Sequence, residues 1–122
     1  MSYRDLIAWK KAMELVRAIY DATDLFPQNE MYGLASQLRR AAVSIPSNIA
    51  EGQAHYTSPE FVRFLRHARG SLAEIETQVL IAQDRGYLSQ PRPEELIRGT
   101  DELGRILSGL ISSMKERVKG DE

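Results

Sequence analysis

Apolar residues recur at intervals of three and four along four segments of this chain, and a proline or a glycine lies between one segment and the next. This spacing predicts helices, each with one apolar face, over residues 3–24, 30–51, 58–86 and 93–118. The breaks fall at Pro27, Gly52, Gly86 and the run SQPRP. Because the connections are short, neighbouring helices are expected to run antiparallel. The chain is therefore predicted to be all-α, an antiparallel up-down four-helix bundle that forms a single domain over residues 1–122.

Local sequence signals mark the start of the third predicted helix and an irregular position within the second. Ser58 is a candidate cap for the third helix, with Pro59 in the first helical position and Glu60 suited to the helix dipole. Pro46 lies inside the second helix, where it removes a backbone donor, so a kink or a break is expected there. Ser44 is placed to satisfy a backbone group that such a kink would free.

Some apolar residues lie beside the predicted core stripes rather than within them. They are Phe64 and Ile81 in the third helix and Ile97 and Ile106 in the fourth. These residues favour a second buried surface, and hence a homo-oligomer. The alternative is a wide core stripe in a monomer.

Composition argues against most catalytic classes. The chain of 122 residues has no cysteine and only two histidines, so a thiolate metal site and a cysteine nucleophile are excluded. No Glu-x-x-His pair is present, although bundles that hold two iron ions require it. No phosphate-binding Gly-Lys-Ser loop or Gly-x-Ser-x-Gly elbow occurs. We therefore expect no catalytic residues, no metal, no cofactor and no enzymatic activity.

The N-terminus has charged residues and no uninterrupted apolar run, so neither a secretion signal nor a membrane-spanning segment is predicted. The expected location is cytoplasmic, without a membrane partner.

Charge is distributed unevenly along the chain, although its net value is only −1. Residues 36–70 hold five arginines against two glutamates, a local charge of +3 that leaves −4 for the remainder. The five are Arg39, Arg40, Arg63, Arg66 and Arg69. Arginine suits bidentate contact with phosphate, so these residues are candidates for binding RNA or DNA. The alternatives are a solvated helix face, or arginines that pair with acidic faces of neighbouring subunits.

Several segments carry a family resemblance. QLRRAAVSIPSNIAEG over residues 37–52, together with DLIAWKKAMELV, FPQNEMYGLASQLRR and GSLAEIETQVLIAQDRGYL, closely resembles the bacterial four-helix bundle family of 23S rRNA intervening-sequence proteins. The resemblance runs from about residue 3 to residue 88. It implies a homopentamer without catalytic activity. A related branch, the accessory variability determinant of diversity-generating retroelements, binds nucleic acid and a reverse transcriptase through a basic surface. This chain differs from that branch because its net charge is slightly negative.

The residues that match the family motif are interpreted as mainly structural. They include Ser44, Pro46, Asn48, Glu51, Gly52, Glu74 and Glu76. Arg39 and Arg40 are expected to pair with Glu74 and Glu76 on the antiparallel third helix. The resulting hypothesis is a non-enzymatic homo-oligomer that contacts RNA or DNA through its arginines. The alternative is an assembly module that binds another protein and no nucleic acid.

Overall fold

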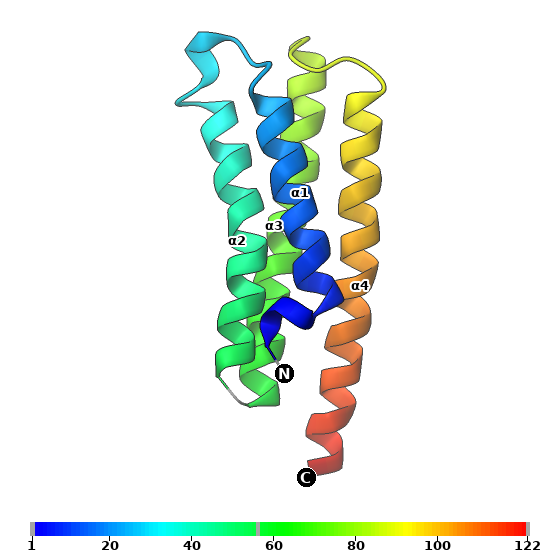
Figure 1. The fold of residues 1–122 in the computed structure, drawn as a ribbon. Coiled ribbons are helices and arrows are strands. Elements are labelled where there is room, and N and C mark those ends of the chain that lie inside the picture. Colours follow the sequence, from blue (N-terminus) through cyan, green and yellow to red (C-terminus); the bar gives the residue numbers. More distant parts are fainter. Residues whose placement is uncertain (1, 56, 122) are drawn as a thin grey trace.

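The computed structural model describes residues 2–55 and 57–121, and it shows an antiparallel four-helix bundle (Figure 1). The helices are α1 (Ile7–Thr23), α2 (Leu34–Ala54), α3 (Ser58–Asp84) and α4 (Arg92–Asp121), with two short 3-10 helices, η1 (Tyr3–Asp5) and η2 (Gln28–Glu30). No strand occurs in these ranges. Each long helix packs against two others, so that α1 and α3 lie diagonally opposite each other. The predicted all-α class and the four helices are confirmed.

The apolar stripes of all four helices face one another and form a continuous core. Its largest fully buried apolar side chains include Ile19 on α1, Leu38, Ile45 and Ile49 on α2, Leu65, Ile75 and Val79 on α3, and Leu103 and Leu107 on α4. Burial of such side chains is the main favourable contribution to a fold of this kind. Within the described ranges, no helix combines the length and the hydropathy that crossing a membrane requires.

The ends of α3 follow the sequence signals closely. Pro59 lies in the first turn with Glu60 beside it, while Thr57 rather than Ser58 takes the capping position, without a side-chain cap hydrogen bond. At the other end Gly86 has a φ of +77°, a conformation that residues with a Cβ rarely adopt. This turn lets the Tyr87 N–H donate to the Ala82 carbonyl at 2.9 Å. Gly86 therefore closes the helix as predicted.

The starts of α1 and α2 differ from the prediction. Leu6 is extended, with φ −71° and ψ 131°, so the first segment divides into η1 and a helix that begins at Ile7. The second helix begins only at Leu34, whose N–H donates to the Glu30 Oε1 atom at 3.2 Å. Glu30 lies outside α2, and its carboxylate thus accepts a hydrogen bond from an N–H group of the first turn that has no partner within the helix.

Pro46 does not break α2, which is one unbroken helix from Leu34 to Ala54. Pro46 has no N–H group, so the Ala42 carbonyl lacks its usual helical hydrogen bond. Side chains of α2 donate hydrogen bonds to two carbonyls nearby, one before Ala42 and one after it. The Ser44 hydroxyl donates to the Ala41 carbonyl, and the Asn48 amide donates to the Ser44 carbonyl, both at 2.7 Å. Pro46 is itself buried in the bundle. Of the kink or break expected at Pro46, the break does not occur.

Gly52 does not end α2 either, because the helix continues to Ala54. Its role is in packing against α3. A Cβ atom at Gly52 would lie 2.8 Å from the Cβ of Phe64 and 2.9 Å from the Cδ1 of Phe61. The absence of a side chain at this position lets the two helices approach closely.

Most of the apolar residues that lie beside the core stripes are covered by contacts within a single subunit. Phe64 is only 8% exposed, and Ile97 and Ile106 pack against the core. Ile81 is 45% exposed. A wide core stripe therefore explains three of these four residues, and they carry no argument for an oligomer.

Candidate nucleic-acid interface

The bundle divides the five candidate arginines between two helices. Arg39 and Arg40 lie on α2, whereas Arg63, Arg66 and Arg69 lie on α3. We refer to the three arginines of α3 as the arginine row. The five arginines therefore form two separate groups with different surroundings.

Arg39 is tied to α1. Its Nε atom donates to the Thr23 hydroxyl and its Nη2 atom donates to the Asp24 carboxylate, each at 2.8 Å. Its guanidinium also lies over the ring of Tyr20, 4.9 Å from the centroid. The predicted pairing of Arg39 and Arg40 with Glu74 and Glu76 is wrong. The carboxylate partner of Arg39 is Asp24, which directly follows α1, and Arg40 forms no ion pair with another described residue. Arg39 thus joins two helices of the bundle and is poorly placed to bind phosphate.

Arg40 is exposed, and no hydrogen bond or ion pair to it is found among the described residues. It lines a shallow hollow together with Tyr20, Met31, Tyr32 and Val43. We call Tyr20, Tyr32, Arg40 and Val43 the tyrosine face. Sequence reasoning missed this face, because its aromatic residues come from α1 and from the connection before α2. Periodicity within one helix carries no signal for such a combination.

The arginine row occupies the first half of α3. Arg63, Arg66 and His67 are exposed and line a shallow hollow together with Gly70. The three side chains share a helix face because they are spaced by three and four residues. Within the described ranges Arg66 has no hydrogen-bond or ion-pair partner, so its guanidinium is available to a ligand.

Arg63 and Arg69 are held by neighbours. The Nη2 atom of Arg63 lies 2.9 Å from the Glu60 carboxylate, and its guanidinium lies 4.6 Å from the centroid of the Phe64 ring. The hydrogen bond from Arg63 lowers the pKa of Glu60, so this exposed pair stays charged at neutral pH. Arg69 donates to the Ser108 hydroxyl at 3.4 Å. Arg63 is therefore oriented but partly neutralised.

A second hollow continues from the arginine row toward α4. Arg69 and Arg105 line it, and so do the carboxylates of Glu76 and Asp101. This surface is mixed in charge. The positive charge is therefore concentrated at Arg63 and Arg66, and Glu60 is the acidic residue beside them.

One residue of the family motif, Ser44, forms a hydrogen bond between α2 and α3. The Ser44 hydroxyl donates to the Ser71 hydroxyl at 2.6 Å, and this bond crosses from α2 to α3. Gln78 is buried, and its amide donates to Gln37 at 3.3 Å. Glu51 and Glu74 are exposed and Glu76 is partly exposed. None of these three glutamates forms an ion pair with another described residue.

Among the described residues, no three His, Asp or Glu side chains cluster in a way that would hold a metal ion.

Comparison with known proteins gives a family match and a structural match. The model of the family described as 23S rRNA-intervening sequence protein matches residues 4–109. The crystal structure of a protein with unknown function, from the S23 ribosomal protein family of Bacteroides thetaiotaomicron, has a TM-score of 0.80 and 19% sequence identity to this chain. The similarity covers 87% of this chain and 96% of that one, and at this identity it shows the fold alone. Among curated proteins no match is found.

Proposed function

The chain belongs to the 23S rRNA-intervening sequence protein family, and on that basis we propose that it is a cytoplasmic, non-catalytic homo-oligomer that binds the phosphate backbone of RNA or DNA. The binding element is the arginine row on the first half of α3. The resemblance to the family implies five subunits.

The observation that carries this proposal is the exposure of Arg63, Arg66 and His67 on one face of α3. Arg66 has no partner among the described residues, and Arg63 is oriented by its contact with the Phe64 ring. A planar guanidinium in this setting matches the oxygen atoms of a phosphate. Contacts of this kind position a nucleic acid without reading its sequence.

The net charge of −1 limits how strongly the whole chain is attracted to a nucleic acid. Attraction of the whole molecule to a polyanion is weak, so binding depends on the local arginines. One subunit offers few phosphate contacts. A homo-oligomer would present several arginine rows at once, and simultaneous contacts raise the overall affinity.

The test is a salt titration of binding to a labelled RNA hairpin and a labelled DNA duplex, followed by fluorescence anisotropy. Arg63→Glu combined with Arg66→Glu is expected to weaken binding and to reduce the salt slope by about 2. The control is Arg98→Glu combined with Lys115→Glu, which changes the net charge equally at exposed positions on α4. Equal loss in both double variants, or no binding by the wild type at low salt, would overturn the proposal.

The second candidate is an assembly module without nucleic-acid binding. The pair between Arg63 and Glu60 favours it, because it shows that a carboxylate can occupy this surface. In that case the arginine row would contact acidic groups of a neighbouring subunit. Reversal of Arg63 and Arg66 would then dissociate the oligomer, which light scattering detects.

A further inference from the structure

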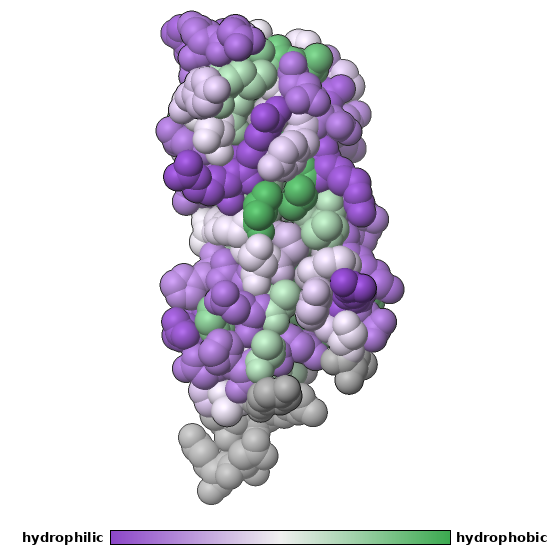
Figure 2. Space-filling view, turned by 60° about the vertical axis from the view of Figure 1, so that its left-hand side comes forward, coloured by the Kyte–Doolittle hydropathy of each residue, from purple (hydrophilic) through white to green (hydrophobic). Residues whose placement is uncertain are grey.

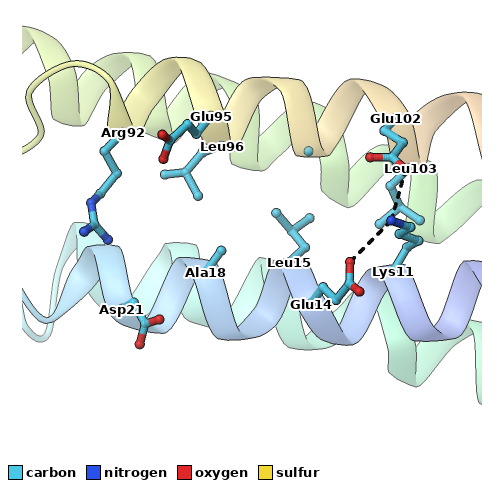
Figure 3. Close-up of a pocket in the computed structure, with 11 residues that line it drawn as sticks. Lys11, Glu14, Leu15, Ala18, Asp21, Arg92, Glu95, Leu96, Glu102 and Leu103 are labelled. Atoms are coloured by element: carbon cyan, nitrogen blue, oxygen red, sulfur yellow. Dashed lines mark ion pairs between the residues drawn. The ribbon is translucent and has the colours of Figure 1, made fainter.

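A groove runs between α1 and α4 on the side of α1 that faces away from α2 (Figure 3). Its volume is about 300 Å³, within the lower range of ligand pockets. Leu15, Ala18, Leu96, Gly99 and Leu103 form its apolar floor. Carboxylates of Glu14, Asp21, Glu95 and Glu102 stand along its edges, with Lys11 and Arg92 as the cations. We call it the acidic groove.

The two ends of the acidic groove differ in whether their charged side chains form ion pairs with each other. At one end Lys11 lies 3.5 Å from Glu14 and 3.2 Å from Glu102, and the hydrogen bond to Glu102 raises the pKa of Lys11. At the other end Arg92 lies beside Asp21 and Glu95, and none of these three residues forms an ion pair with another described residue (Figure 3). Two carboxylates against one guanidinium leave this end with a net negative charge. This end therefore suits an occupant with a cationic group beside an apolar or aromatic body.

The tyrosine face of the same chain has this chemistry. Tyr32 is 95% exposed, and Val43 and Tyr20 are also exposed. Figure 2, in which the α2 side of the bundle is turned toward the viewer, shows apolar side chains in several small patches between hydrophilic regions. No carboxylate lines the hollow at the tyrosine face, whereas Arg39 and Arg40 do. Exposed tyrosine and arginine are the residue types that dominate binding energy in protein interfaces.

The positions of the two surfaces allow copies of the chain to meet side by side. Both surfaces flank α1, one toward α2 and the other toward α4. The connection that holds Tyr32 and the start of α4 lie at the same end of the bundle (Figure 1). Rotation about an axis parallel to the helices therefore brings the two surfaces together without a shift along the axis. Contacts between two different patches of this kind form a ring when the rotation between neighbouring subunits closes, and an open filament when it does not.

We propose that the acidic groove of one subunit receives the tyrosine face of the next. Tyr32 covers the leucine floor, and Arg40 faces the carboxylates of Asp21 and Glu95. The proposal rests on the homo-oligomer of the proposed function and names its interface. In such a ring α1 faces the axis. Because α3 lies diagonally opposite α1, the arginine row remains on the outside, free to bind phosphate.

The test uses the absence of cysteine from the chain. Tyr32→Cys and Ala18→Cys place one thiol on each surface, and a short bismaleimide links thiols that lie close together. Neither single variant is expected to cross-link to itself, whereas an equimolar mixture gives a dimer. The double variant gives a ladder of bands that ends at the ring size. The control is Ala18→Cys mixed with Thr77→Cys, an exposed position on α3, and it should give no cross-link.

A charge exchange tests the polar part of the contact without cross-linking. Arg40→Glu and Glu95→Arg are each expected to weaken self-association about tenfold, and the double variant to recover most of that loss. An oligomer whose mass is unchanged in all three variants, and which does not cross-link, would overturn this interface while leaving the homo-oligomer intact. A wild-type chain that stays monomeric at high concentration would overturn both.

Discussion

The guanidinium of Arg39 on α2 donates to the carboxylate of Asp24, the residue that directly follows α1, with a distance of 2.8 Å. The same side chain also bonds the buried hydroxyl of Thr23. The Thr23 hydroxyl in turn donates to the Ile19 carbonyl at 2.8 Å. Arg39 thus fastens the end of α1 to α2.

Replacement of Arg39 by alanine should therefore destabilise the fold. We expect a loss of about 1–2 kcal/mol in the free energy of unfolding, below the full value of a charged hydrogen bond because the Asp24 side chain is 70% exposed. Urea denaturation measures it, with Arg98→Ala as the control at an exposed arginine. The salt slope of nucleic-acid binding should be unchanged. A loss of binding without a loss of stability would contradict the structural role.

Replacement by alanine is expected to destabilise the fold at one glycine and to stabilise it at another. Gly52→Ala places a methyl group within 2.8 Å of Phe64 and should cost about 1–3 kcal/mol. Gly70→Ala meets no atom within 4 Å and should stabilise α3 by about 0.5–1 kcal/mol, because alanine is the better helix former. Urea denaturation of the two variants checks this contrast. Similar shifts in the same direction would show that α2 and α3 are not packed closely at Gly52.

Glu30 makes the stability depend on pH. The Tyr87 hydroxyl donates to its carboxylate at 2.8 Å, and this bond, followed by that from the Leu34 N–H, lowers the pKa of Glu30 below 4.5. A carboxylate with a lowered pKa in the folded state stabilises the fold above its ordinary pKa. That contribution disappears as the pH falls through the folded-state value.

The wild type should therefore unfold at a higher temperature than Glu30→Gln at pH 7, and the difference should shrink below about pH 4.5. Thermal unfolding followed by circular dichroism at several pH values measures it. Tyr87→Phe is the control, because it removes the largest cause of the shift and should reduce the pH dependence. A difference between wild type and Glu30→Gln that stays constant from pH 7 to pH 3 would argue against this assignment.

The helices could be predicted from the sequence because one face of each helix is buried, and burial imposes an apolar repeat of three and four. The end of α3 was also predictable, since Gly86 has the positive φ that its closing turn requires. The interruption at Leu6 and the continuity of α2 through Pro46 were not. Both positions are defined by tertiary packing, because Leu6 packs against the core and Pro46 is buried in the bundle.

The candidate surfaces were predictable only where one helix carries them. Arg63 and Arg66 share a face of α3, and their spacing shows this directly. The acidic groove combines two segments that lie far apart in the sequence, and the tyrosine face combines α1 with the connection and helix that follow it. The partner of Arg39 likewise lies 15 residues earlier, across a turn whose geometry no local pattern encodes. Such combinations follow from packing and not from periodicity.

The central claim is that one surface assembles the subunits and a different surface, on α3, binds nucleic acid. Native mass spectrometry of the variant that combines Arg63→Glu and Arg66→Glu, with and without the RNA hairpin, tests it most directly. The account predicts an oligomer of unchanged subunit number that no longer carries RNA. A variant that falls apart into monomers would contradict the account, because the arginines would then belong to the subunit interface.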